Sequence, residues 1–212
     1  NILIGVSIGL AIMCKWLTAL IVIPVWLVLS VKKEGLREMS KNLVIIAVSC
    51  AAVFLPWQTY IYRNFHNEAS WEAAYNRRHI TEALEGHAGS VFYHLLYMKK
   101  LFGNGIYLPV AWFSIRFFRN FRDRGLQALM LWFWLPYIFF SLVKTKMSAY
   151  PFFAGPAAFM ISSLFVFYLK DNFFEGRYRY AAKALAGLCL VFILSHAVGR
   201  NSMIFRNFNR NP

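Results

Sequence analysis

Long apolar runs alternate with short charged links along this chain, and that alternation predicts its architecture. A helix that crosses a membrane needs about 20 mostly apolar residues. The single runs expected to cross are residues 42–62, 104–118, 126–143, 149–169 and 181–198. With a further apolar stretch at residues 2–31, they predict an all-α, polytopic membrane bundle of about six or seven transmembrane helices, because helices satisfy their own backbone hydrogen bonds in lipid.

The stretch from residue 2 to residue 31 carries one charge, at Lys15. Thirty helical residues would extend about 45 Å, which is too long for one untilted crossing. The stretch is therefore either one long tilted helix or two shorter helices broken near Lys15, and we favour two. A lone ionisable residue in such a run is a functional candidate. At a helix end, however, the free-energy cost of placing its charge in the membrane is small, so the position needs no functional explanation.

A polar segment at about residues 63–103 separates two of the apolar runs, and we expect it to form a loop on the outer face. Its last part, Val91–Phe102, predicts an amphipathic helix that lies on the membrane surface without crossing it. Leucines and aromatic residues would form the apolar side of this helix, whereas His94, Lys99 and Lys100 would point elsewhere.

Three of the charged links are short and basic. Each holds four lysine or arginine residues: Lys32, Lys33, Arg37 and Lys41; Arg116, Arg119, Arg122 and Arg124; Lys170, Arg177, Arg179 and Lys183. The positive-inside rule places these links in the cytoplasm. Lys15, the 63–103 loop, Lys144 and Lys146 then fall on the outer face. Outer cations are not needed to set the topology, so they are candidates for function.

Composition supports a membrane protein. Hydrophobic residues make up 59% and aromatic residues 18% of the chain, and many aromatics lie at the ends of apolar runs. The net charge of +14 sits in short loops, which favours lipid phosphate or topology control over nucleic acid. The cysteines Cys14, Cys50 and Cys189 lie in apolar segments without CxxC spacing, as small buried hydrophobes do.

The chain begins at Asn1 inside an apolar run, without an initiator methionine or a signal-peptide pattern. We therefore expect a piece of a longer protein, truncated at the N-terminus and probably at the C-terminus. Residues 1–199 are assigned to one transmembrane domain, and residues 200–212 to the start of an outer-face C-terminal segment.

The turn KTK places Lys144 and Lys146 between two apolar runs, with Tyr150 just beyond. One interpretation is a phosphate site, since lysine supplies a mobile charge and a tyrosine hydroxyl can donate to a phosphate oxygen. The other is a pair of snorkelling lysines that anchor helix ends. So short a turn should hold both lysines at headgroup depth as surface charges, whose removal would cost little stability.

The outer-loop stretch NRRHITEALEGH, residues 76–87, is the most strongly charged part of the loop. It could recognise an anionic or sugar substrate, or it could be a solvated surface with weak ion pairs, for instance between Arg78 and Glu82. Glu82 and Glu85 could form an acid–base pair, but neighbouring glutamates are also common on surfaces. His79 and His87 lack a zincin spacing, so the stretch predicts no metal site.

Four stretches of the chain, taken in order, resemble one family of enzymes. They are IGLAIMCKWLTAL, LPWQTYIYRNF, NRRHITEALEGHAGSVFYHL and FFSLVKTKMSAYPFFAGPAAFM. Their order and spacing over residues 5–160 resemble the bacterial membrane glycosyltransferases of the protein-mannosyltransferase and lipid A aminoarabinose-transferase type, which have the GT-C fold. The chain departs from the family pattern at Trp16, Gln58 and Met147–Ser148, where the family has glycine, tyrosine and a leucine–proline pair.

This resemblance implies a multi-pass enzyme of the bacterial inner membrane. It would transfer a sugar from a polyprenyl-phosphate carrier to a lipid, glycan or protein acceptor on the outer face. The carrier-phosphate site would be formed by Lys144, Lys146, Tyr150, Arg77, Arg78 and Lys15. Candidate acceptor or sugar contacts are Glu85, His87 and Tyr60. The family's acidic catalytic residue lies upstream of the matching stretches, so the resemblance assigns no catalytic residue here.

The chemistry of the transfer agrees with such a site, because negative charge builds on the leaving phosphate and fixed cations stabilise it. A divalent cation could share that task, but no ligand cluster demands one. An alternative is a transporter or flippase for an anionic lipid or lipid-linked sugar, which would use the same cations without chemistry. A structural membrane subunit is a third interpretation.

Overall fold

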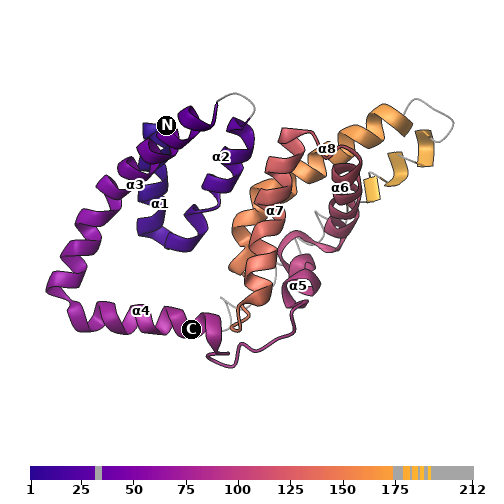
Figure 1. Cartoon of the computed structure of the whole chain (residues 1–212). Coiled ribbons are helices and arrows are strands. Elements are labelled where there is room, and N and C mark those ends of the chain that lie inside the picture. Colours follow the sequence, from indigo (N-terminus) through magenta and orange to yellow (C-terminus); the bar gives the residue numbers. More distant parts are fainter. Residues whose placement is uncertain (32–34, 174–178, 182, 186, 189–190, 192–212) are drawn as a thin grey trace, which may run out of the picture.

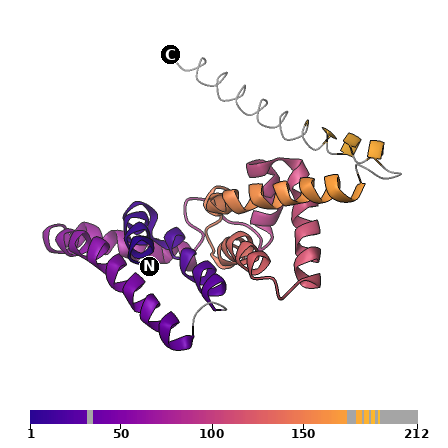
Figure 2. The same cartoon turned by 90° about the horizontal axis from the view of Figure 1, so that it is seen from above.

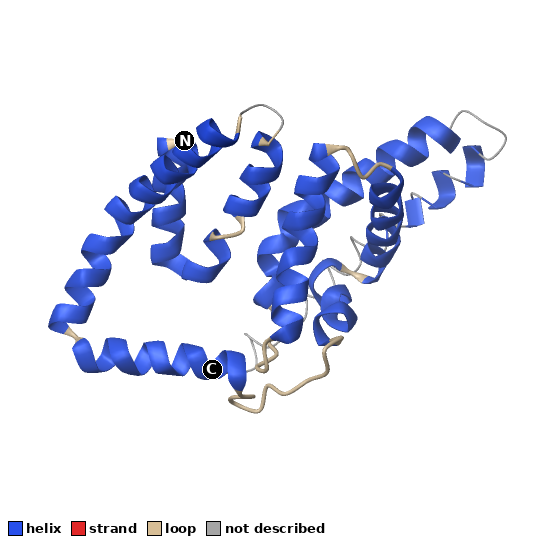
Figure 3. Cartoon of the chain, viewed as in Figure 1, coloured by secondary structure: helices blue, strands red, loops and turns tan. Residues whose placement is uncertain are grey.

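The computed structural model describes residues 1–31, 35–173, 179–181, 183–185, 187–188 and 191. The predicted outer C-terminal segment at 200–212 lies outside the described residues, as does most of the predicted last crossing at 181–198. The elements are α1 (Ile2–Ala19), α2 (Val22–Ser30), α3 (Leu36–Asn64), α4 (His66–Thr81), α5 (Tyr93–Phe102), η1 (Asn104–Ile106), α6 (Tyr107–Arg119), α7 (Arg124–Leu142), η2 (Tyr150–Ala154) and α8 (Gly155–Phe173). The part of the chain that the structure describes contains helices and loops without strands, so the predicted all-α class is confirmed (Figure 3).

The helices form two groups that α4 and α2 connect. Helices α1, α2 and α3 lie at one side of the molecule, and α5, α6, α7 and α8 lie at the other (Figure 1). Helix α4 runs from the end of α3 toward the end of α7, and α2 packs against α7. The view in Figure 2 shows α8 alongside α6 and α7 and apart from α3.

Three helices are long and apolar enough to cross a membrane: Leu36–Asn64, Arg124–Leu142 and Tyr150–Asn172. They match three of the predicted crossings, at 42–62, 126–143 and 149–169, to within one residue at the ends where the predicted ranges extend beyond the helices. The predicted crossing at 104–118 lacks this support, because α6 has 13 residues and a helix of that length extends only about 20 Å. The described residues therefore support three crossings and leave the predicted six or seven unconfirmed.

The apolar stretch at the N-terminus forms two helices, as predicted. Helix α1 is kinked at Lys15, whose backbone is extended (φ −160°, ψ 83°), and it ends at Ala19 before α2 begins. Helix α1 packs along α3 because glycine permits a close backbone approach there. A Cβ atom placed on Gly9 would lie 2.9 Å from the carbonyl oxygen of Cys50 and 2.9 Å from the Cβ of Val53.

The core of the second group lies between α6, α7 and α8. Phe113 of α6 and Phe133 of α7 are fully buried in a cluster with Ala157, Ala158 and Ile161 of α8. This packing immobilises α7 and therefore the point at which it ends, next to the KTK turn.

Helix α5 differs from its predicted orientation. The histidine expected to point away from the apolar side, His94, is only 1% exposed and shares the inward face with Met98, four residues on. Leu96 lies on the opposite side and is 60% exposed. The prediction was wrong because the helix packs its His94–Met98 face against protein, so the aromatic ring of histidine is covered by α7 and its continuation rather than by water.

Candidate functional site

The KTK turn connects α7 to η2, and the outer loop folds back onto it. Three backbone hydrogen bonds make this contact. The N–H of Lys144 donates to Ile80 (3.1 Å), the N–H of Thr145 donates to His79 (3.1 Å), and the N–H of Lys146 donates to His87 (2.7 Å). Residues 59 to 66 positions apart in sequence are thus joined, and two of the acceptors, His79 and Ile80, lie in the last turn of α4. The contact places the charged outer-loop stretch directly beside the turn.

The buried side chain of Thr145 adds two hydrogen bonds to the same contact. It is fully buried, its hydroxyl donates to the carbonyl of Glu82 (2.8 Å), and it accepts from the N–H of Leu84 (3.1 Å). A buried hydroxyl needs such partners, because leaving it unpaired would cost free energy. Sequence reasoning overlooked Thr145, although its place between the two lysines was the available signal.

The two lysines of the turn have different environments. Lys144 is exposed, as predicted for a charge at the membrane surface. Lys146 is only 3% exposed, so the expectation that both are surface charges is wrong. Its Nζ donates to the carbonyl oxygens of Phe140 (3.1 Å) and Ser141 (2.5 Å) at the end of α7.

Those bonds explain why Lys146 turns inward. The last carbonyls of a helix lack partners within the helix, and a cation at that end is favoured by the helix dipole. Burial, followed by the charge of Lys144, lowers the pKa of Lys146. Gly89 of the outer loop covers its aliphatic stem, and a Cβ on Gly89 would lie 3.0 Å from Cγ of Lys146.

Next to the turn, four side chains form a polar and aromatic cluster that we call the outer cluster: Tyr75, His79, Glu85 and Tyr150. The hydroxyl of Tyr75 donates to Oε1 of Glu85. The ring of Tyr75 meets the edge of the His79 ring with 4.8 Å between centroids. The hydroxyl of Tyr150 lies 3.5 Å from Nδ1 of His79. The cluster therefore joins α4, the outer loop and the start of the next membrane helix.

Local backbone geometry aims the Glu85 carboxylate into the cluster. Glu85 has φ 53° and Gly86 has φ 74°, so two successive residues occupy the left-handed region. A non-glycine residue in that region is uncommon and is held by its surroundings. The hydrogen bond to Glu85, together with burial and the charge of Glu85, raises the pKa of Tyr75, while nearby Arg78 acts in the opposite direction.

His94 lies beneath the turn and is the buried group that sequence reasoning placed wrongly. Its ring contacts those of Phe140 and Tyr150, with centroids 6.1 Å and 6.4 Å away. Neither ring nitrogen has a hydrogen-bond partner among the described residues. Burial and then the charge of Lys146 lower the pKa of His94 to about 4, although the nearby carbonyl of Phe140 acts to raise it. The imidazole is consequently neutral near pH 7.

The predicted arginines lie at the edge of the site. Arg78 directly precedes His79, whose carbonyl accepts from the turn, so the Cα atoms of Arg78 and His79 are about 3.8 Å apart. Its Nε donates to Oε2 of Glu82 at 2.9 Å, in an exposed pair that contributes little stability. Arg77 is exposed and lies one position earlier on α4.

Three further predicted residues have different positions. His87 joins the site through its backbone, as the acceptor for Lys146. Lys15 lies at the kink of α1, and no hydrogen bond or ion pair among the described residues connects its side chain to the turn. Tyr60 lies near the end of α3, where its ring stacks on Trp57 with centroids 5.8 Å apart.

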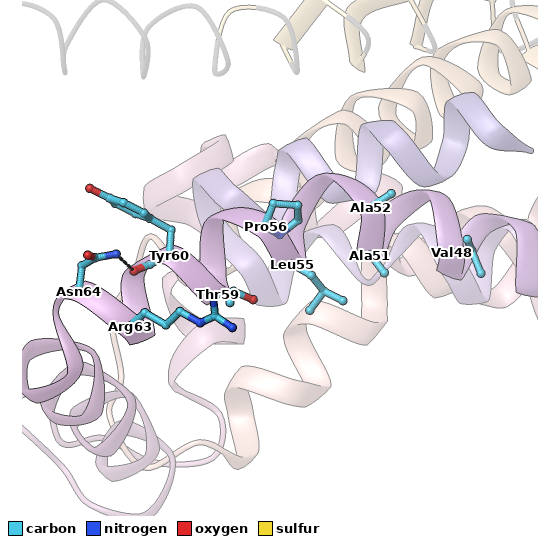
Figure 4. A pocket seen from close by; sticks show the side chains of 9 residues that line it. All are labelled: Val48, Ala51, Ala52, Leu55, Pro56, Thr59, Tyr60, Arg63 and Asn64. Atoms are coloured by element: carbon cyan, nitrogen blue, oxygen red, sulfur yellow. Dashed lines mark hydrogen bonds between the residues drawn. The ribbon is translucent and has the colours of Figure 1, made fainter.

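Tyr60 also borders a shallow concavity on one face of α3 (Figure 4). The concavity is lined by Val48, Ala51, Ala52, Leu55, Pro56, Thr59, Tyr60, Arg63 and Asn64. The lining is apolar toward the start of the helix and polar toward its end. All of it comes from a single helix, so the structure does not join Tyr60 to the outer cluster.

Within the described ranges, no group of three or more histidine, cysteine, aspartate or glutamate side chains could hold a metal ion. The side chains gathered at the site are cations, hydroxyls, an imidazole and a carboxylate. An exposed ammonium, an exposed guanidinium and the hydroxyl of Tyr150 at the start of a candidate membrane helix are groups that can bind a phosphate.

These features define a helical membrane protein with a polar site where two of its candidate crossings meet an outer loop. Comparison with curated proteins shows similarity to the undecaprenyl phosphate-alpha-4-amino-4-deoxy-L-arabinose arabinosyl transferase 1 of Pseudomonas fluorescens (strain Pf0-1). The identity is 28% over 155 residues, which cover 70% of this chain and 26% of that protein. The predicted resemblance to membrane glycosyltransferases of the aminoarabinose-transferase type is thereby confirmed.

The chain thus spans about a quarter of the length of this relative. No family model matches the sequence. No solved structure matches the chain either.

Proposed function

We propose that this chain is part of a multi-pass glycosyltransferase of the bacterial inner membrane. It takes a sugar from a polyprenyl-phosphate carrier and transfers it to a lipid acceptor on the outer face. The observation that supports this most directly is the docking of the outer loop on the KTK turn. That contact gathers Lys144, the outer cluster and the two arginines at the end of two membrane helices.

Within this proposal, the structure favours different roles for the two lysines. Lys144 is exposed and its ammonium is available to the carrier phosphate. Lys146 already directs two of its N–H donors to α7. Its charge still strengthens the positive potential of the site, because interactions in a partly dry environment are screened less than in water. We therefore assign Lys144 to direct phosphate contact and Lys146 to positioning of the turn.

Tyr150 and Arg78 complete the proposed phosphate site. Tyr150 starts the next candidate crossing, and its hydroxyl already faces His79. Arg78 can exchange its exposed partner Glu82 for a phosphate, because an exposed ion pair contributes only about 0–1 kcal/mol. Glu85, with the tyrosines beside it, would then contact the sugar or the acceptor.

Binding of undecaprenyl phosphate by the purified protein tests the site. We expect Lys144→Gln to weaken binding by about fivefold, the equivalent of roughly 1 kcal/mol for one cation at a lipid surface. Lys99→Gln, which removes an exposed charge from α5, is the matched control and should leave binding unchanged. Equal affinities of the Lys144 and Lys99 variants would overturn the proposed phosphate site.

Two further measurements separate the alternatives. Release of the sugar to a lipid A acceptor in vitro distinguishes a transferase from a transporter, which would move the lipid-linked sugar without cleaving it. Repeating the binding measurement in EDTA determines whether a divalent cation shares the phosphate charge, in which case affinity should fall.

A further inference from the structure

The turn between α6 and α7 lies at the opposite end of α7 from the KTK turn. Helix α7 has 19 residues, and a helix of that length extends about 28 Å, close to the thickness of the hydrocarbon core. If the KTK turn is at one membrane surface, the α6–α7 turn is at the other. We call residues 116–124 of this turn, with the sequence RFFRNFRDR, the arginine turn.

The charges of the arginine turn are unbalanced. It contains four arginines and one acidic residue, Asp123. Asp123 is the N-cap residue of α7. Its Oδ1 accepts hydrogen bonds from the N–H groups of Gly125 (2.8 Å) and Leu126 (3.2 Å). The ion pairs among the described residues are Lys41–Glu38 and Arg78–Glu82. Neither Arg122 nor Arg124 therefore forms an ion pair within that part of the chain.

Arg124 is held in place with most of its donors unused. Its Nη1 donates to Oε1 of Gln127 (2.8 Å), and Nε2 of Gln127 donates to the carbonyl of Phe121 (2.6 Å). The Nε of Arg124 is buried and has no partner within the described part of the chain. A buried guanidinium N–H without an acceptor is costly, and an anion bound beside Arg124 would supply one.

A cavity of about 630 Å³ opens beside these arginines. Polar lining comes from Arg122, Arg124 and Gln127, and apolar lining from Val28 of α2, Phe117, Phe121, Met130 and Leu131. The cavity is therefore basic on one side and apolar on the other. Phe121 is 61% exposed, which suits an aromatic residue at the level of lipid headgroups.

We propose that this cavity binds the headgroup of an anionic phospholipid, whose phosphate meets Arg122 and Arg124 and whose acyl chains follow the apolar wall along α2 and α7. The amphiphilic lining favours a lipid over a free phosphate ion, which would gain nothing from the phenylalanine, methionine and leucine side chains. The site would join α2, from the N-terminal group of helices, to α6 and α7 of the other group. This inference is independent of the proposed transferase activity.

Lipid retention measured by native mass spectrometry tests the proposal, with the protein released from nanodiscs that contain equal amounts of phosphatidylglycerol and phosphatidylcholine. We expect the protein to retain phosphatidylglycerol preferentially. Arg122→Gln should reduce that preference about fivefold, and Arg124→Gln should reduce it by a similar factor, as expected for loss of one cation at the lipid surface. Arg119→Gln, which removes an exposed arginine of the same turn that does not line the cavity, is the matched control.

The outcomes distinguish a lipid site from simpler explanations. Equal reductions in the Arg119, Arg122 and Arg124 variants would show that the turn attracts anionic lipid by net charge alone, and this would overturn the proposal. Displacement of phosphatidylglycerol by millimolar inorganic phosphate would also overturn it, because the acyl chains would then contribute nothing. Because Arg122 is exposed, its variant tests the site even if the Arg124 variant folds poorly.

Discussion

At the scale of single residues, the two lysines of the KTK turn show how the environment assigns different roles to identical side chains. Lys144 and Lys146 are separated by one residue, so in an extended segment they would be expected on the same side. The two side chains nevertheless differ in direction. The ammonium of Lys146 turns back to the carbonyl oxygens at the C-terminal end of α7. The free carbonyls of the helix, rather than lysine itself, determine which of the two is buried.

Substituting each lysine with methionine should separate these roles. Lys146→Met should lower the free energy of unfolding by about 2 kcal/mol, because two helix carbonyls lose a charged hydrogen-bond donor. Lys144→Met should change it by no more than about 0.5 kcal/mol, as is usual for an exposed residue. Thermal unfolding in detergent measures both. A Lys146 variant as stable as the Lys144 variant would contradict the assignment of Lys146 as a positioning residue.

His94 should make the site sensitive to acid. Its pKa is about 4 in the folded protein, against an ordinary value of 6.5. Between these values the unfolded chain binds more protons than the folded one, so stability falls as pH decreases. The groups that face the imidazole are Lys146, Tyr93 and Tyr150, and none of them is expected to titrate in this range.

The expected loss for His94 is about 2 kcal/mol between about pH 7.5 and about pH 5. His94→Phe keeps the ring packing against Phe140 and removes the titrating group, so that variant should lose this component of the pH dependence. Melting temperatures of the two proteins at both pH values provide the measurement. If they decline in parallel, another group is responsible.

At the scale of secondary structure elements, close approach and end-capping decide how the helices are arranged. Helix α1 lies against α3 because Gly5 and Gly9 present no side chains to its backbone. Asp123 begins α7, and Lys146 satisfies its end. Three backbone hydrogen bonds then join the outer loop to the KTK turn. They supply partners for backbone groups that would otherwise be unpaired.

A larger residue at Gly9 should separate α1 from α3. Gly9→Leu forces a side chain into a space where even a Cβ would lie 2.9 Å from the Cys50 carbonyl, and overpacking of this kind costs about 1–3 kcal/mol. Gly105→Leu is a suitable control, because nothing lies within 4 Å of a Cβ there. Comparable melting temperatures for the two variants would show that the α1–α3 contact is not tight in the membrane.

At the scale of the whole molecule, the charged groups occupy the two ends of the candidate crossings. The outer cluster and Lys144 lie at the end of α7, and the arginine turn lies at its start. Exposed apolar side chains cover much of α3. In its most apolar 18-residue stretch, only 6% of the residues are buried inside the protein. Such a helix requires lipid or further protein around it.

This arrangement predicts opposite accessibility for the two ends. In a variant without the native cysteines, a cysteine at Ala149 should react with a membrane-impermeant maleimide added to intact spheroplasts. A cysteine at Asn120 should react only after the membrane is opened. Labelling of both positions from the same side would contradict the placement of the KTK turn and the arginine turn at opposite membrane surfaces.

Local sequence was sufficient to predict the helical class, three candidate crossings, the break near Lys15, and the resemblance carried by the KTK turn and the EGHAG loop. These features depend on local composition and on residues close in the chain. Periodicity also located helix α5, but it assigned His94 to the wrong side, because the face of a helix that is buried depends on what packs against it.

Which residues form the site depends on contacts between distant segments of the chain. The contacts of Thr145 with Glu82 and Leu84 join positions more than 60 residues apart, and no local pattern specifies such a pairing. The burial of Lys146 follows from the free carbonyls at the end of α7, and the separation of Tyr60 and Lys15 from the outer cluster follows from how the two groups of helices are arranged. Hydrophobic patterning is a property of neighbouring residues, whereas the pairing of buried polar groups is settled when distant segments meet.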